Sequence, residues 1–237
     1  MFDRLRKAFT RNAHSRPSLH DAEGAASEAP ALGPVSVWAA SQGLSFGSRA
    51  PGVVFSLKGT VGGRPWRLEV GRPSRPFIEG DELRARAELG VDPEVSVVVM
   101  NRVLKDALEN EAYSVCTDSL QTAVGGGMTE EMRWLAMYED VAWESAPRSL
   151  WAHWAVLASK PQHAPAWLHD DLVQRMLGWP APGLAPAVPF VLALRGGKVY
   201  LRMQQGPGGL AGLRHATGIF TAAAESALEC FAAAGSR

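Results

Sequence analysis

The sequence has few cysteines, no net charge and no long apolar run, and each absence narrows the class of protein. Its two cysteines, Cys116 and Cys230, belong to no CxxC motif or Cys/His cluster, which favours reduced, buried thiols over a disulfide framework. Because 24 basic residues balance 24 acidic ones, wholesale attraction to nucleic acid or to an anionic membrane is not expected. No segment approaches the roughly 18 uninterrupted apolar residues that span a bilayer, and the charged N-terminus lacks the apolar core of a secretory signal. A cytoplasmic protein without a transmembrane segment is therefore expected.

The sequence also lacks the short motifs that mark common catalytic and cofactor sites. It has no GxSxG, SxxK or GxxxxGKS/T pattern. His163 and His169 lie across a proline turn at a spacing that does not bring metal ligands together, and a helix N-cap at His169 or Asp170 explains this group of residues. No metal and no cofactor are therefore expected. An enzyme, either a hydrolase or a transferase, remains an alternative to a binding protein, and its site would combine dispersed residues: His163, Asp170, Cys116 and Arg202.

Segments of different composition follow one another along the chain. Residues 1–11 are predicted to form a short basic amphipathic segment, and peripheral membrane association through it is a second alternative function. Residues 12–33 contain almost no large apolar side chain, so they cannot offset the entropy of ordering and are expected to be a disordered linker. Residues 34–235 are predicted to form a single α+β domain. A subdivision into two loosely similar halves, about 34–115 and 150–235, stays open.

Two predicted β-hairpins determine the fold class. Residues 53–70 and 189–203 each contain two runs suited to strands around a Gly-Gly pair, which supplies the positive φ of a tight turn. Residues 82–89 alternate strictly between apolar and polar, and residues 94–101 are almost continuously apolar, so these two strands are predicted to extend the first hairpin into a four-stranded meander. The expected fold is α+β, with a mainly antiparallel sheet, made of this β-meander and a C-terminal hairpin, packed against several helices.

The middle of the chain is acidic and rich in tryptophan. Six of the eight tryptophans fall between Trp134 and Trp179, and nine acidic residues between positions 106 and 144 stand against one arginine. Large side chains at helical spacing favour core packing over an exposed aromatic surface, with the acidic residues on the solvated face. A long alanine-rich helix is predicted after the glycine-rich stretch 206–209.

Three arginines are predicted to share one face of the first sheet. The alternation of the strands directs Arg67, Arg84 and Arg86 away from the core, and we predict that they bind an acidic protein partner. No aromatic side chain is clearly interleaved with them, so nucleic-acid binding is not favoured. Three glutamates on the same face are positioned to neutralise the arginines pairwise: Glu69, Glu82 and Glu88.

A second candidate site is an anion-binding cradle before the last helix. Gly208 and Gly209 precede that helix, and Arg202 and Arg214 are close to them in sequence. Backbone amides at a helix N-terminus, together with arginines, bind phosphate and carboxylate groups.

The C-terminal half resembles that of uncharacterised bacterial proteins with a strand, a leucine-rich helix and a hairpin in this order. The resemblance rests on residues 154–159, 166–168, 172–177 and 190–201. It implies no catalytic residue and no ligand. The function that the sequence favours is a non-enzymatic protein–protein interaction module, in which the acidic middle or the arginine-bearing face meets a partner of unknown identity, and the oligomeric state is not indicated.

Overall fold

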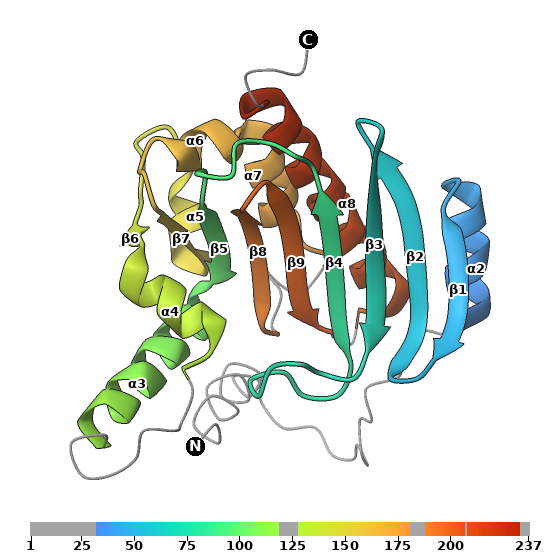
Figure 1. Cartoon of the computed structure of the whole chain (residues 1–237), viewed down its shortest axis with the longest axis horizontal. Helices are drawn as coiled ribbons and strands as arrows, with labels where there is room; N and C mark the ends of the chain where they lie inside the picture. Colours follow the sequence, from blue (N-terminus) through green and yellow to red (C-terminus); the bar gives the residue numbers. More distant parts are fainter. Residues whose placement is uncertain (1–31, 119–127, 181–187, 207, 233–237) are drawn as a thin grey trace, which may run out of the picture.

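The computed structural model describes residues 32–118, 128–180, 188–206 and 208–232, which form one nine-stranded sheet and seven helices. The strand order is β1-β2-β3-β4-β9-β8-β5-β7-β6 and every pairing is antiparallel (Figure 1). This confirms an α+β fold with a mainly antiparallel sheet. The strands are β1 (Ser45–Ala50), β2 (Val53–Val61), β3 (Arg64–Gly71), β4 (Glu82–Glu88), β5 (Val97–Asn101), β6 (Glu139–Asp140), β7 (Trp154–Ala158), β8 (Phe190–Arg195) and β9 (Lys198–Gln204). The helices are α2 (Leu32–Ser41), α3 (Arg102–Asp118), α4 (Glu130–Met137), α5 (Arg148–His153), α6 (His163–Trp167), α7 (Asp170–Leu177) and α8 (Gly209–Cys230).

The described part of the chain begins close to the predicted start of the domain. Helix α2 starts at Leu32, just before the expected boundary at residue 34. Residues 1–11 and nearly all of 12–33 lie outside the described residues, so the basic amphipathic segment and the linker stay predictions. Strands from both proposed halves of the domain join in the same sheet, because β4 pairs with β9. No helix in the described ranges combines the length and the apolar character needed to cross a bilayer.

Both predicted hairpins are confirmed. Strands β2 and β3 turn at Gly62 and Gly63, with φ of 53° and 73°, and β8 and β9 turn at Gly196 and Gly197, with φ of 54° and 71°. Residues with a Cβ rarely adopt such positive φ values, so glycine makes these two-residue turns possible.

The two glycines of the β8–β9 turn provide a matched test of this account. A Cβ on Gly196 would meet open space, whereas a Cβ on Gly197 would lie 2.8 Å from the carbonyl oxygen of Val91. We expect Gly196→Ala to lower the free energy of unfolding by about 1 kcal/mol, from the left-handed backbone alone. For Gly197→Ala we expect a loss of about 2–3 kcal/mol, since the backbone at Val91 must also move. Urea unfolding followed by tryptophan fluorescence measures both losses, and equal losses would contradict the close contact.

The predicted fourth strand of the meander was wrong. Strand β5 does not pair with β4, because the β8–β9 hairpin lies between them, and β1 completes the four-stranded meander instead. All five residues of β5 are buried, and β7 and β8 pair with its two edges. An apolar run predicts a central strand but does not say which strands lie beside it. The neighbours of β5 come from segments far along the chain.

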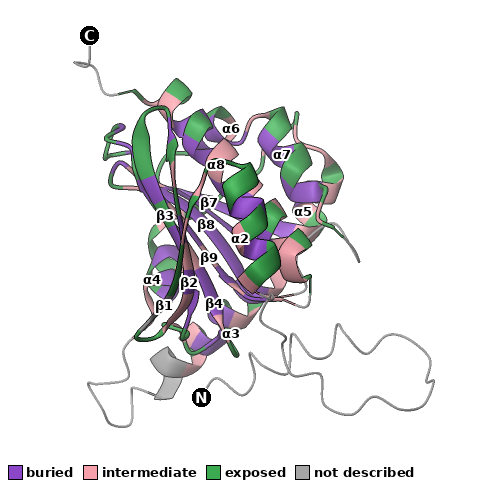
Figure 2. Ribbon diagram, turned by 90° about the vertical axis from the view of Figure 1, so that its right-hand side faces the viewer, coloured by how far each residue is buried: buried purple, intermediate pink, exposed green. Residues whose placement is uncertain are grey.

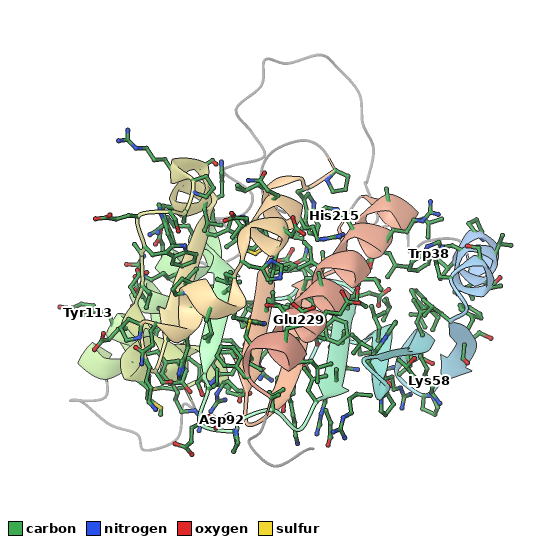
Figure 3. All side chains as sticks on the ribbon, turned by 90° about the horizontal axis from the view of Figure 1, so that it is seen from above. Trp38, Lys58, Asp92, Tyr113, His215 and Glu229 are labelled. Carbon is green, nitrogen blue, oxygen red and sulfur yellow. The ribbon has the colours of Figure 1, made fainter. Side chains whose placement is uncertain are left out.

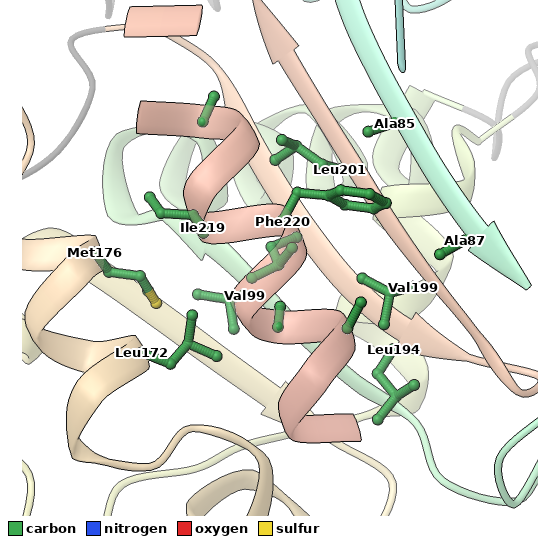
Figure 4. Packing of buried hydrophobic residues seen from close by; sticks show 14 of the residues in the cluster. Ala85, Ala87, Val99, Leu172, Met176, Leu194, Val199, Leu201, Ile219 and Phe220 are labelled. Atoms are coloured by element: carbon green, nitrogen blue, oxygen red, sulfur yellow. The ribbon is translucent and has the colours of Figure 1, made fainter. Parts of the chain in front are cut away.

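One face of the sheet carries the larger core. Helices α2 and α5 to α8 cover this face (Figure 2). Figure 4 shows Phe220 of α8 near Leu201 of β9, and Ile219 of α8 on the side toward Met176 of α7. The tryptophans of the middle segment belong largely to the two cores: Trp134, Trp154 and Trp167 are buried, and Trp143, Trp151 and Trp179 are half-buried and pack against the larger core.

The opposite face is only partly covered. Helices α3 and α4 pack over β5, β7 and β8, around apolar side chains such as Met100, Leu104 and Ala193. Among the described residues, the one helix that reaches the same face of β2, β3, β4 and β9 is α4, whose Glu131 pairs with Arg202 of β9 at 3.7 Å. Figure 1 looks onto these four strands with α8 behind them. We call the surface formed by their outward side chains the open face.

Candidate functional site: the open face of the sheet

The strand register aligns the predicted arginines in rows across the open face. Lys58 of β2 is opposite Arg67 of β3, Arg67 is opposite Arg86 of β4, and Arg86 is opposite Tyr200 of β9. These four residues form the first row. A second row runs beside it through Ser56, Glu69, Arg84 and Arg202. The prediction that Arg67, Arg84 and Arg86 share a face is confirmed, since Leu68, Ala85 and Ala87 between them are buried in the larger core.

Tyr200 is a residue of the site that the sequence analysis missed. The guanidinium carbon of Arg86 lies 5.6 Å from the centroid of the Tyr200 ring, within the range of a cation–π contact. The alternation of apolar and polar residues around Tyr200 does predict that its side chain points to the other face of the sheet from that of Leu201. Only the β4–β9 pairing, which joins distant parts of the chain, places the ring among the arginines.

The open face is hollowed along these rows. A depression of about 720 Å³ is lined by the whole first row, by Glu69, Arg84 and Arg202 of the second row, and by neighbouring residues. An adjoining depression of about 380 Å³ shares Tyr200 and Arg202 and continues beneath α4, where Trp134 and Val191 line it. The larger one has five cationic side chains, Lys58, Arg67, Arg84, Arg86 and Arg202, against two carboxylates, Glu69 and Glu88. A chain without net charge thus concentrates positive charge here.

The two carboxylates are shared among several cations. The pairs are Arg67–Glu69, Arg84–Glu69 at 3.6 Å, Arg86–Glu88 at 2.5 Å and Lys198–Glu88 at 3.7 Å. Arg67 and Arg86 remain about half exposed, with side-chain exposures of 53% and 51%. Lys58 is exposed and forms no ion pair with another described residue. The expected pairwise neutralisation is therefore incomplete, and exposed pairs of this kind contribute little to stability.

Like charges stand directly opposite one another in both rows. Lys58 is opposite Arg67, Arg67 is opposite Arg86, and in the second row Arg84 is opposite Arg202. Each such cross-strand pair costs a fraction of a kcal/mol, up to about 1 kcal/mol. An anion placed between the side chains would remove this cost.

A buried ionic network borders the open face and fixes Arg202. The fully buried carboxylate of Glu82 accepts hydrogen bonds from the amide and hydroxyl of Ser74 and pairs with Arg202 at 2.7 Å. Glu131 of α4, which is 1% exposed, pairs with Arg75 at 2.8 Å and with Arg202 at 3.7 Å. Burial lowers the pKa of Arg202 from its ordinary value, but an arginine still stays charged at neutral pH. The charge of Arg202 is thus already compensated, and its network holds α4 and the β3–β4 loop against the sheet.

The predicted anion-binding cradle is not brought together. Arg202 extends onto the open face, whereas the guanidinium of Arg214 lies 5.8 Å from the Trp38 ring in the helical layer, on the other side of the sheet. Gly208 and Gly209 stand at the start of α8. Figure 3 shows Trp38, over whose ring Arg214 lies, in the helical layer, and Lys58 of the open face at the sheet. The reason is the alternation of β9, which directs Leu201 and Met203 toward α8 and Arg202 away from it.

The dispersed residues of the alternative enzymatic site also lie apart. The ring of His163 packs edge-on against Phe231 at 5.6 Å, and burial lowers its pKa, while Arg202 is on the opposite face of the sheet. His169 caps α7, its side chain accepting a hydrogen bond from the amide of Leu172, as the sequence predicted. Within the described ranges, no three His, Cys, Asp or Glu side chains are grouped as metal ligands would be. The side chain of Cys116 lies outside what the structure describes.

His215 gives the fold a testable dependence on pH. Burial lowers the pKa of His215 below the ordinary value of about 6.5, and the charge of Arg175 adds to this, although Nε2 donates a hydrogen bond to the Arg175 carbonyl at 2.9 Å. The unfolded chain therefore binds the proton more readily, so stability present above about pH 6.5 is lost as the pH falls through the lower folded-state pKa.

Between about pH 7 and pH 5, we expect the free energy of unfolding to fall less in His215→Gln than in wild type, because glutamine keeps an N–H donor but does not titrate. Urea midpoints of wild type and variant, measured at each pH, give the difference. A difference that stays constant with pH would contradict this account.

Comparisons with protein-family models, with curated proteins and with solved structures found no match to this chain. The resemblance of the C-terminal half to uncharacterised bacterial proteins therefore stays a prediction.

Proposed function

We propose that the protein is a non-enzymatic protein–protein interaction module whose open face binds an acidic segment of a partner protein. The observation that supports this most directly is the concentration of cations on the open face of a chain whose total charge is zero. Besides the already compensated Arg202, four cations, Lys58, Arg67, Arg84 and Arg86, line the larger depression against the two carboxylates Glu69 and Glu88. The like-charge pairs of the rows cost stability in the free protein, and an acidic ligand would compensate them.

The chemistry of the rows fits carboxylates on a protein segment better than a nucleic acid. Arginine presents a fork of N–H donors that matches a carboxylate in two hydrogen bonds, and Arg67 and Arg86 have exposed heads for this. Single-stranded nucleic acid is bound through a series of aromatic platforms along a cationic track. Tyr200 is the one aromatic side chain in the rows. A ligand that complements this surface would have two or three carboxylates for the arginines and an apolar side chain for the Tyr200 ring.

The proposal takes the cytoplasm as the compartment in which the partner is met. The expected burial of Cys230 was wrong, because its side chain is exposed near the end of α8. It forms no disulfide with another described residue, which fits a reducing environment.

Binding of a fluorescein-labelled oligoglutamate peptide, followed by fluorescence anisotropy at low salt, tests the proposal. We expect the double variant Arg67→Gln/Arg86→Gln to weaken binding by roughly tenfold or more, since each arginine removed takes away a charge-assisted contact. Affinity should also fall with rising salt, because the contacts are exposed. The matched control is Arg148→Gln/Arg175→Gln, which removes the same charge from exposed arginines of α5 and α7 in the helical layer.

If the two double variants lost peptide affinity equally, binding would depend on net charge alone, and the proposal would be contradicted. A labelled single-stranded RNA that binds the open face more tightly than the peptide, with the same sensitivity to Arg67→Gln/Arg86→Gln, would replace a protein partner by a nucleic acid.

A further inference from the structure

We infer that the acidic segment bound by the open face is an α-helix lying across the strands, with acidic residues at positions i, i+3 or i+4, and i+7, and an apolar residue about one turn further on. This inference rests on the proposed function and specifies the structure of the partner. It follows from the direction and spacing of the first row and from the layers of the fold.

The spacing of the first row matches a helix. Lys58, Arg67 and Arg86 lie on successive strands, which are about 4.8 Å apart. The distance across the strands from the first cation to the third is therefore about 10 Å. On an α-helix, residues i and i+7 share a face and are separated by about 10.5 Å along the axis. In an extended peptide, side chains on the same side recur about every 6.8 Å, so three acidic residues would span about 13.5 Å. A helix across the strands therefore places one carboxylate near each cation.

The fourth residue of the row predicts an apolar position in the partner. Tyr200 follows Arg86 along the row, and beyond it the smaller depression has, besides six charged residues, the apolar side chains of Val191, Ala193 and Trp134 in its lining. The Tyr200 ring is only partly exposed. A leucine at about i+11 of the helix would reach Tyr200 and the entrance of this depression.

The layers of the fold leave room for a helix at this place. On the other face, α8 crosses the sheet and contacts both β2 and β9 (Figure 1). On the open face, α4 reaches β9 at the Arg75–Glu131–Arg202 network, and among the described residues no helix packs over the outward side chains of β2, β3 and β4. A partner helix beside α4 would cover a face that an antiparallel sheet can otherwise leave in contact with water.

Three synthetic peptides of equal length test the inference. The first, the facing peptide, is an alanine- and glutamine-based helix with glutamate at positions 4, 8 and 11 and leucine at position 15. The second has the same composition with the glutamates distributed around the helix, and the third is the facing peptide with a central proline, which breaks the helix. Circular dichroism verifies that the first two are equally helical. Anisotropy then gives the dissociation constant of each for wild type, for Arg67→Gln/Arg86→Gln and for Arg148→Gln/Arg175→Gln.

We expect the facing peptide to bind about tenfold more tightly than the other two, and to lose this advantage only in Arg67→Gln/Arg86→Gln. Replacing its leucine with alanine is expected to weaken binding to wild type by about fivefold and to have little effect on Tyr200→Ser, which would show that the leucine contacts Tyr200.

The contrary outcomes distinguish a failure of the helical partner from a failure of acidic-segment binding. Equal binding of all three peptides, weakened by Arg67→Gln/Arg86→Gln, would overturn the helical partner and leave the acidic-segment proposal standing. Absence of binding at millimolar peptide, or binding that Arg67→Gln/Arg86→Gln does not alter, would overturn both. Self-association in solution that the same double variant abolishes would identify the occupant as a second copy of the chain and would overturn the helical partner as well.

Discussion

Replacing Arg202 with leucine is expected to lower the free energy of unfolding by about 3–5 kcal/mol. The substitution leaves the carboxylate of Glu82 fully buried, with Ser74 as its remaining hydrogen-bond partner, and removes one of the cations beside Glu131. An uncompensated buried charge is far more costly than the loss of an exposed pair. Urea unfolding at neutral pH, followed by fluorescence and by circular dichroism, measures the change.

Two companion variants decide whether the buried charge is the cause. Replacing both partners, in Arg202→Leu/Glu82→Met, is expected to recover most of the loss, because the carboxylate is then absent. Arg86→Gln, at a side chain that is 51% exposed, is expected to stay within about 0.5 kcal/mol of wild type. If Arg202→Leu were no more damaging than Arg86→Gln, the network would not hold α4 and the β3–β4 loop as described.

Trp167→Ala is expected to lower the free energy of unfolding by about 4–5 kcal/mol. Trp167 of α6 is completely buried, and its indole nitrogen donates a hydrogen bond to the carbonyl of Ala223 in α8 at 2.8 Å. In return, the hydroxyl of Ser226 in α8 donates to the Trp167 carbonyl at 2.6 Å. The alanine variant combines a large cavity with a buried carbonyl that loses its donor, and this is a large share of the 5–15 kcal/mol typical of a whole domain.

The contributions of packing and hydrogen bonding are separable at Trp167. Trp167→Phe keeps most of the ring and is expected to cost about 1–3 kcal/mol, chiefly for the lost donor. Val37→Ala, at a side chain that is 71% exposed, is the control and should change stability by less than about 0.5 kcal/mol. Equal losses for Trp167→Phe and Trp167→Ala would mean that the ring itself contributes nothing, which its complete burial contradicts.

The elements that the sequence predicted well depend on local chemistry. A Gly-Gly pair between two alternating runs determines a hairpin within about fifteen residues, and strict alternation determines which side chains leave the core. For this reason the common face of Arg67, Arg84 and Arg86 and the N-cap at His169 were both predictable.

The parts that were missed depend on contacts between distant segments. Nothing local in residues 94–101 shows that the β8–β9 hairpin will separate β5 from β4. The pairing of β9 with β4 brings Tyr200 beside Arg86, and it brings Arg202 to Glu82, although the two are far apart in the sequence. The glutamates of α4 were expected on a solvated face, yet Glu131 is buried against Arg75, because the β3–β4 loop reaches across to this helix.

The insertion of the β8–β9 hairpin between β4 and β5 constrains the order in which the strands of the sheet can assemble during synthesis. During synthesis, β1 to β4 and β5 to β7 leave the ribosome before residues 190–204, which pair with β4 on one side and with β5 on the other. Until that hairpin is made, two central strands expose unpaired edges, which are the usual starting points of aggregation. The sheet therefore closes only after residues 190–204 have emerged, and its slow step is expected to be the docking of this hairpin into the gap between β4 and β5.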